Sequence, residues 1–313
     1  MNAPKAFAVL GPTAGGKTAL ALNIARSLPV EIISLDSALV YCGMDIGTAK
    51  PTAEELVAVP HHLIDIISPL ESYSAADFVG DCVRLVNEIH ARGRYPLIVG
   101  GTMMYFHALT EGLNDLPGAD AAVRAQLQAE KKEHGLAGLY RRLQEVDPIT
   151  AGRLKANDSQ RIERALEVYL LTGRPLSEHF TEQKQAASLL DLCTVALIPE
   201  DRHLLHQQIE KRFLSMLEHG FLDEIHALRR DYPQLHADMP SMRCVGYRQA
   251  WDYLEGETDY DTFVEKGIIA TRQLAKRQLT WLRKIPLAHT LDPYADSDYV
   301  QTALALARQH FQE

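Results

Sequence analysis

The sequence predicts an α/β fold in which a parallel sheet core is interrupted by a helical insertion. Four short apolar segments have the length and composition of buried strands: residues 6–10, 30–35, 96–99 and 192–198. Helical patterns alternate with these segments, which is typical of open parallel sheets. Between residues 117 and 188, by contrast, helical patterns follow one another with only short turns. We therefore expect a core built from residues 1–116 and 189–313, with residues 117–188 inserted as a helical domain.

The first strand runs directly into a glycine-rich loop and then a helix. Residues 11–18 read GPTAGGKT, which fits the phosphate-binding P-loop pattern G-x-x-x-x-G-K-[ST] in its required strand–loop–helix context. Glycines let backbone N–H groups face phosphate oxygens, and the positive end of the next helix points at them. Lys17 would place its charge on the terminal phosphate, and the Thr18 hydroxyl would ligate Mg²⁺. The core is thus P-loop NTPase-like, with a cradle of Gly11, Pro12, Thr13, Ala14, Gly15, Gly16, Lys17 and Thr18.

Composition limits the function classes. The chain has 313 residues and a net charge of −9, so any contact with nucleic acid needs a local basic patch. No apolar run approaches the length that spans a membrane, and the N-terminus leaves no room for a signal peptide before the first strand. We expect a cytoplasmic protein without membrane contact. The cysteines form no C-x-x-C pair and predict neither disulfides nor a zinc site: Cys42, Cys82, Cys193 and Cys244.

Asp36 comes directly after the strand at residues 30–35. A carboxylate at the carboxyl end of a strand beside a P-loop stands where ligands bind in open α/β sheets. Asp36 could hold Mg²⁺ through water or act as a general base. The alternative is a helix N-cap, since Asp and Ser37 both have that preference.

The segments after Asp36 predict a loop, a strand and a helix. Residues 41–51 contain two glycines and a proline, which predicts an irregular loop lying over the site. We expect His61 and His62 to be hydrogen-bonded structural residues before a strand at 63–66, rather than metal ligands. Residues 74–92 predict an amphipathic helix with one apolar face: Phe78, Cys82, Leu85, Val86 and Ile89.

The strand at 96–99 is informative because of the three residues after it. P-loop NTPases place an Asp there to hold Mg²⁺, whereas this chain has Gly100, Gly101 and Thr102. The missing Asp makes ATP hydrolysis a less favoured function for this chain. The two glycines would allow a ligand to approach the backbone closely.

Helices are expected in the insertion at residues 120–134, 138–145 and 159–171. Arg161 and Arg164 share one helix face. From the residues alone, a solvated face paired with Glu163 and Glu167 is the favoured interpretation.

Two later stretches are basic. Arg212 comes after a strand and a turn that would bring it back towards the phosphate site. Residues 267–284 contain five cations and no acid, with Arg272, Lys276 and Arg277 along one side of a helix. A nucleic-acid contact, a membrane-surface helix and a solvated face are all compatible with this pattern.

Taken together, the motifs strongly resemble those of the bacterial tRNA dimethylallyltransferases, also called tRNA isopentenyltransferases. The resemblance covers nearly the whole chain and rests on seven segments in order: GPTAGGKTALA, EIISLDSALVY, GMDIGTAKP, GGTMMYFHALTEGL, NDSQRIERALEVYLLTG, SMRCVGYRQAW and ATRQLAKRQLTWLR. One small departure is Gly15, where such loops often carry Ser.

The resemblance implies transfer of a dimethylallyl group from dimethylallyl diphosphate to N6 of adenosine 37, beside the anticodon, in tRNAs that read codons beginning with U. Diphosphate is released and Mg²⁺ is the cofactor. The P-loop would then hold a diphosphate leaving group, which accounts for the missing second aspartate. Whether a nucleoside triphosphate also binds is left open, and we expect a monomer.

The resemblance also implies roles for individual residues. Asp36 would be the catalytic base, with Thr102 and Arg212 as further catalytic residues. Thr13 and Lys17 would contact the diphosphate. The residues implied to contact tRNA are Asp36, Ser37, Ala38, Leu39, Thr102, Arg124, Gln160, Arg161, Ile162, Glu163, Arg164, Arg243, Cys244, Val245, Gly246, Tyr247, Arg248, Lys276, Arg277, Gln278, Leu279, Thr280, Trp281, Leu282 and Arg283.

Two other functions compete with prenyl transfer. A small-molecule kinase or nucleotide switch would use the same P-loop on ATP and would turn it over without tRNA. A nucleic-acid-binding protein with a vestigial P-loop is the other alternative, against which the intact Lys17 and Thr18 argue.

Overall fold

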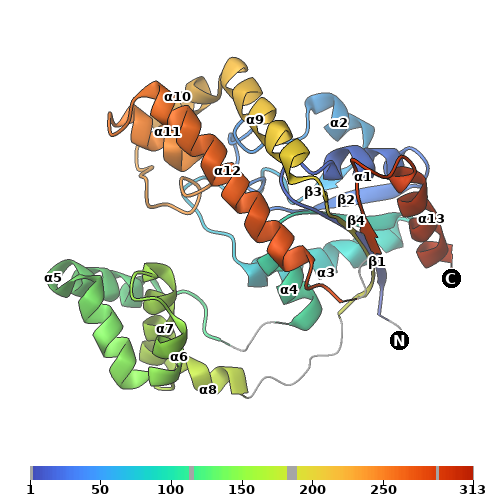
Figure 1. The fold of residues 1–313 in the computed structure, drawn as a ribbon. Helices are drawn as coiled ribbons and strands as arrows, with labels where there is room; N and C mark the ends of the chain where they lie inside the picture. The colour runs from blue at the N-terminus through green and yellow to red at the C-terminus, as the bar shows by residue number, and fades with distance from the viewer. Residues whose placement is uncertain (1–2, 113–115, 182–188, 287–288, 313) are drawn as a thin grey trace. The chain divides into compact units, whose positions relative to one another are not determined.

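The computed structural model describes residues 3–112, 116–181, 189–286 and 289–312. Within these ranges one parallel sheet has the strand order β3-β2-β4-β1-β5-β6 (Figure 1). The strands are β1 (Lys5–Leu10), β2 (Val30–Leu35), β3 (His61–His62), β4 (Tyr95–Gly100), β5 (Asp191–Leu197) and β6 (His289–Leu291). The predicted α/β class with a parallel sheet is confirmed.

The chain divides into two compact units, residues 1–110 with 188–313 and residues 111–187. The expected insertion began at 117, a few residues after the observed division. The helices of the unit that contains the sheet are α1 (Lys17–Ala25), α2 (Ala53–Ala58), α3 (Ala75–Ala91), α4 (Met103–Glu111), α9 (Arg202–Glu218), α10 (Phe221–Asp231), α11 (Tyr247–Leu254), α12 (Tyr260–Leu282) and α13 (Tyr299–Gln312).

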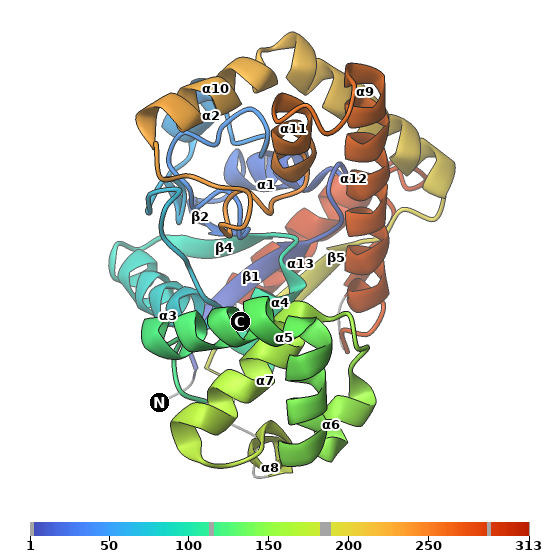
Figure 2. The same cartoon turned by 90° about the vertical axis from the view of Figure 1, so that its left-hand side faces the viewer.

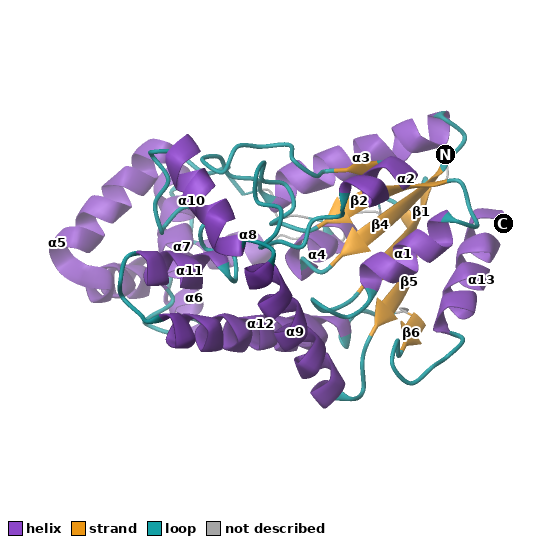
Figure 3. Ribbon diagram, turned by 90° about the horizontal axis from the view of Figure 1, so that it is seen from above, coloured by secondary structure: helices purple, strands orange, loops and turns teal. Residues whose placement is uncertain are grey.

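Two layers of helices cover the sheet because its central strands are apolar on both faces (Figures 2 and 3). Phe7 and Val9 of β1 pack in the cluster that includes α1 and α13. The alternate residues Ala6, Ala8 and Leu10 pack with α3, α4 and α12. The carboxyl ends of β1, β2 and β4 lie side by side, which places the P-loop, Asp36 and Thr102 at one edge of the sheet.

Helix α3 forms as predicted. Ser74 caps it through a capping box with Asp77, and the five apolar residues of the predicted face are all buried.

The strand expected at residues 63–66 is wrong. The histidines themselves form β3, while Leu63 and Asp65 adopt left-handed backbone conformations with φ of 61° and 55°. In place of a strand pairing, Asp65 forms an ion pair with the buried amine of Lys50, and its N–H donates to the Leu39 carbonyl at 3.1 Å. His62 bonds to Glu31 at 2.7 Å, which gives it the expected structural role.

The helical unit contains α5 (Ala121–Val146), α6 (Pro148–Arg153), α7 (Ser159–Thr172) and α8 (Leu176–Thr181). Gly135, with φ 71°, marks the predicted break between the first two helical patterns. The short helices α6 and α8 were not predicted, because one or two turns give too little periodicity. Residues 182–188, at the end of the expected insertion, lie outside the described residues.

The helical unit has an apolar core of its own, built from α5 and α7 around Leu127, Leu139 and Leu143 and, on α7, Ile162 and Leu166.

Across the ranges that the structure describes, no helix is both long and apolar enough to cross a membrane.

Candidate active site

The P-loop is a tight turn between β1 and α1. Gly16 has φ 83° and is the N-cap of α1, and the Gly15 N–H donates to the Pro12 carbonyl at 3.1 Å. Ala14 also has a positive φ of 59°, which costs about 1 kcal/mol for a residue with a side chain. The Tyr294 hydroxyl donates to the Ala14 carbonyl at 3.0 Å and holds this turn.

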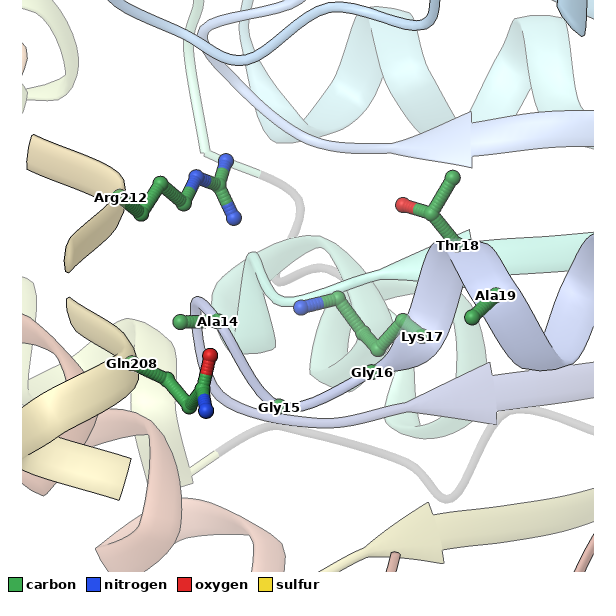
Figure 4. A pocket seen from close by; sticks show the side chains of 8 residues that line it. All are labelled: Ala14, Gly15, Gly16, Lys17, Thr18, Ala19, Gln208 and Arg212. Carbon is green, nitrogen blue, oxygen red and sulfur yellow. The ribbon is translucent and has the colours of Figure 1, made fainter. Parts of the chain in front are cut away.

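A cavity of about 250 Å³ lies against the loop, between residues 14–19 and helix α9 (Figure 4). The amine of Lys17, the hydroxyl of Thr18 and the guanidinium of Arg212 all point into this space in Figure 4. Arg212 therefore lies where the sequence analysis places it. Gln208, which the sequence analysis missed, lines the cavity as well. Its position one helical turn before Arg212 on α9 is the signal that would have found it.

The cavity is lined by two half-buried cations, Lys17 and Arg212. Burial lowers the pKa of Lys17 to about 8; the nearby Asp36 carboxylate raises it and Arg212 lowers it further. Burial also lowers the pKa of Arg212, and Asp36 opposes that effect. The Lys17 amine donates to the Pro12 carbonyl at 2.7 Å. Two poorly hydrated cations facing one cavity form a site for a multiply charged anion.

The lowered pKa of Lys17 gives a testable pH dependence. Lys17 is cationic below about pH 8 and neutral above it, so affinity for a diphosphate, such as the dimethylallyl diphosphate that the resemblance implies, should fall as pH rises through that value, by up to about tenfold per unit. Lys17→Arg keeps its charge throughout and should show a flatter profile. Titration calorimetry of both proteins from neutral to alkaline pH measures the difference, since the ionisation of the donor itself is common to both. If affinity falls with pH in the same way in wild type and Lys17→Arg, ionisation of Lys17 does not control binding of the diphosphate.

Asp36 and Thr102 stand at the ends of the neighbouring strands β2 and β4. The Ser37 N–H donates to the Thr102 hydroxyl at 3.0 Å, and the N–H groups of Gly101 and Thr102 both donate to the Leu35 carbonyl. Asp36 Oδ1 accepts from the Ala38 N–H at 2.9 Å within a turn. No helix begins there, so the alternative of a helix N-cap for Asp36 is wrong.

Gly100 and Gly101 are glycines for a different reason from the one expected. A Cβ on Gly100 would lie 2.0 Å from the Leu35 carbonyl oxygen, and one on Gly101 would lie 2.4 Å from Gln278 Nε2. The close approach is made by the protein's own backbone and a buried amide. The sequence could not show this because both neighbours come from other parts of the chain.

Two protonated groups, Cys244 and Tyr105, lie close enough to Asp36 to be affected by its charge, and Tyr41 lies beside Cys244. Burial raises the pKa of Cys244 to about 12 and also raises the pKa of Tyr105, and the Asp36 charge adds to both effects. Burial also raises the pKa of Tyr41 to about 12. All three groups are neutral at physiological pH and add no negative charge beside Asp36. The sequence analysis did not single out either tyrosine.

A family model described as IPP transferase matches residues 39–285, most of the chain. The chain belongs to the IPP transferase family. Related proteins described as tRNA dimethylallyltransferase come from Neisseria meningitidis serogroup A, 66% identical over 99% of each chain, and Burkholderia thailandensis, 59% identical over 96% of this chain and 93% of the relative.

Solved structures agree with this membership. A tRNA isopentenylpyrophosphate transferase from Bacillus halodurans is 37% identical, with a TM-score of 0.71 over 99% of this chain and 97% of that one. A eukaryotic dimethylallyltransferase acting on tRNA gives a TM-score of 0.81 at 27% identity, over 98% of this chain and 79% of that one.

In this IPP transferase, helix α12 has two distinct faces. Its exposed side chains include Lys276, Arg277, Thr280, Trp281 and Arg283. Gln278, Leu279 and Leu282 are buried, so we correct their assignment from tRNA contact to packing. Arg272 is paired with Glu210 at 2.7 Å and does not extend the exposed basic face.

The segment at residues 243–248 is also divided. Arg243 is exposed, and Cys244, Val245 and Arg248 are half-buried. Gly246 and Tyr247 are buried, and the Tyr247 hydroxyl donates to Glu224 at 2.5 Å. These two are likewise reassigned to packing. Glu224 also accepts the N–H groups of Asp45, Ile46 and Gly47, which fixes the irregular loop predicted at 41–51.

In the helical unit, buried Glu167 organises the cations. It pairs with Arg164 at 2.6 Å and with Arg124 at 2.8 Å. Glu163 instead bonds Lys131. Gln160 and Arg161 are exposed, whereas Ile162 is buried and belongs to the core of this unit. The residues alone favoured a solvated face paired with Glu163 and Glu167; Arg164 does pair with Glu167, but that acid is buried, and Arg161 pairs with Asp158 at 3.6 Å.

The donor set fits Mg²⁺ bound mainly through a ligand. Thr18 is exposed at the first turn of α1. In the described part of the chain, no group of three or more His, Cys, Asp or Glu side chains could hold a metal. Mg²⁺ keeps several waters and takes one or two protein groups together with substrate phosphates, so a single hydroxyl beside a phosphate site is compatible with it.

Proposed function

We propose that this IPP transferase is a tRNA dimethylallyltransferase, which moves a dimethylallyl group from dimethylallyl diphosphate to N6 of adenosine 37 and releases diphosphate. The observation that carries the proposal is the arrangement of the site. A cavity lined by two half-buried cations, Lys17 and Arg212, lies within electrostatic reach of a carboxylate at the end of the next-but-one strand of the sheet. The named activity of the 66% identical relative supports it.

The donor side stabilises the leaving group. An allylic diphosphate breaks its C–O bond readily only when the charge developing on the departing oxygens is neutralised. Lys17 and Arg212 face the same cavity and supply that charge in a poorly hydrated site, where it has its largest effect. Mg²⁺ held by Thr18 and the phosphate oxygens would add further positive charge to the diphosphate.

The acceptor side removes a proton. The adenine amine is a weak nucleophile because its lone pair is delocalised into the ring, so attack on the allylic carbon requires loss of an N6 proton to a base. Asp36 is the base in this proposal. Ser37 and Thr102, which bond to each other, would hydrogen-bond the flipped adenosine, and Ala38 and Leu39 would line it.

Basic and polar side chains at the surface bind the tRNA in this proposal. The chain carries a net charge of −9, so binding depends on local patches. We assign this role to Arg243 and Arg248, to the exposed face of α12, and to Gln160, Arg161, Arg164 and Arg124 of the helical unit. Trp281, 47% exposed between the α12 cations, offers a surface for base stacking.

Lys276→Ala and Arg277→Ala test the α12 surface. Each should reduce the slope of log K for tRNA against log salt by about 1, because one phosphate contact is lost. Lys266→Ala removes an exposed cation from the other half of the same helix and is the matched control. Filter binding across a salt series measures the slopes. Wild-type slopes in both variants would remove α12 from the interface.

The proposal is separated from a kinase by two assays on one preparation. Labelled dimethylallyl diphosphate with tRNA should give labelled tRNA and free diphosphate, and ATP alone should not be turned over. ATP turnover without tRNA, combined with no label transfer, would favour the kinase.

A further inference from the structure

Gln278 occupies an unusual place on the helix that carries the exposed cations. Its neighbours Lys276 and Arg277 are exposed, whereas Gln278 is 9% exposed and turns into the core of the sheet-containing unit. A buried amide costs free energy unless all of its polar atoms are bonded. Where this amide bonds therefore matters.

The amide bridges two segments of the active site. Its Oε1 accepts the N–H of Thr13 in the P-loop at 2.8 Å, and its Nε2 donates to the Gly101 carbonyl at 2.9 Å. One partner is an N–H and the other a carbonyl, so only one orientation of the amide satisfies both. A hydrocarbon or an ionised carboxylate at this position cannot make the same pair of bonds.

The contact is also sterically fitted. A Cβ on Gly101 would lie 2.4 Å from Gln278 Nε2 and 3.0 Å from the Gly11 carbonyl oxygen. The glycine after β4 thus leaves the space that the amide fills. A larger residue at position 101 would therefore displace the Gln278 amide.

Each end of the bridge leads to a group of the proposed mechanism. Thr13 belongs to the loop that carries Lys17. Gly101 precedes Thr102, whose hydroxyl accepts the Ser37 N–H next to Asp36. A single side chain of α12 therefore fixes the diphosphate loop against the end of β4.

We infer that Gln278 is a positioning residue that sets the distance between the diphosphate cradle and the Asp36–Thr102 pair. The inference rests on the function proposed above. It also replaces the direct tRNA contact first expected of Gln278: the exposed residues of α12 meet the tRNA, and Gln278 holds that helix to both halves of the reaction centre. Misplacement of reacting groups by about 1 Å can lower a rate about 100-fold, so the loss should appear in the chemical step.

Gln278→Met and Gln278→Glu test this inference. Met has a similar length and makes neither bond, so kcat should fall about 10–100-fold and the KM for the prenyl donor should rise. A Glu carboxylate still accepts the Thr13 N–H but cannot donate to Gly101, so kcat should fall with a donor KM closer to wild type. The Kd for tRNA and its salt slope should be unchanged in both. Gln301→Met makes the same substitution at an exposed position of α13 and is the control.

The possible results are distinguishable. If the wild-type protein fails to prenylate tRNA, the proposed function itself is wrong. If the wild type is active and the Gln278 variants change only the tRNA Kd, the positioning role is wrong. Variants that lower Tm while kcat and donor KM per folded molecule stay at wild-type values, measured well below the Tm, would also overturn it.

Discussion

Replacing Asp36 with Asn is expected to lower the rate of prenyl transfer about 10²–10⁴-fold, the range typical of removing a positioned general base. Asn keeps the size of the side chain and can still accept the Ala38 N–H, so the turn at residues 36–38 should survive. The amide cannot take the N6 proton. Single-turnover kinetics with saturating tRNA and dimethylallyl diphosphate measure the chemical step directly.

The same substitution should also change the cations of the cavity. The Asp36 charge raises the pKa of both Lys17 and Arg212, so its removal should lower the pKa of Lys17 further below about 8. The weakening of donor binding with rising pH should therefore begin at a lower pH in Asp36→Asn. If Asp36→Asn transfers the prenyl group at a rate within about threefold of wild type, a group other than Asp36 is the base.

Replacing Arg212 with Met is the second large effect we expect. Removing one group that stabilises the developing charge of a leaving group typically costs about 10²–10³ in kcat. The loss should appear in the chemical step, because the charge on the bridging oxygen grows as the C–O bond breaks. Rapid-quench measurement of diphosphate release is the appropriate assay.

Two variants control this experiment. Arg202→Met removes an exposed cation from the first turn of the same helix α9 and should leave the rate near wild type. Arg212→Lys keeps a charge but not the planar donor fork, so it should recover part of the loss. If Arg212→Met instead raises only the KM for tRNA, its side chain belongs to the tRNA interface and not to the diphosphate site.

Much of the fold could be predicted because its signals are local. A few consecutive residues are enough to recognise the apolar segments of β1, β2, β4 and β5. The same holds for the amphipathic face of α3. The P-loop pattern likewise needs only eight consecutive residues, Gly11–Thr18, in their strand–loop–helix context. Residues 63–66 show the limit of local patterns. Their apolar residues predict a strand, whereas in the structure Asp65 pairs with Lys50 and no strand forms there.

The parts of the site that escaped prediction depend on contacts between distant residues. Nothing near Gln278 indicates that it turns inward to meet Thr13, and a basic, aromatic helix argues for the opposite. Gly101 gives no sign that its missing side chain makes room for that amide. Glu224 and Tyr41 are similar cases, since their neighbours are set by packing and not by sequence spacing.

The most direct test of the central claim is mass spectrometry of nucleosides from a tRNA incubated with the protein and dimethylallyl diphosphate. The substrate is an unmodified transcript with adenosine at position 37, compared with one carrying guanosine there. We predict that N6-isopentenyladenosine appears only with the adenosine transcript, in amounts that match the diphosphate released. Diphosphate release without a prenylated nucleoside, or equal modification of both transcripts, would contradict the account.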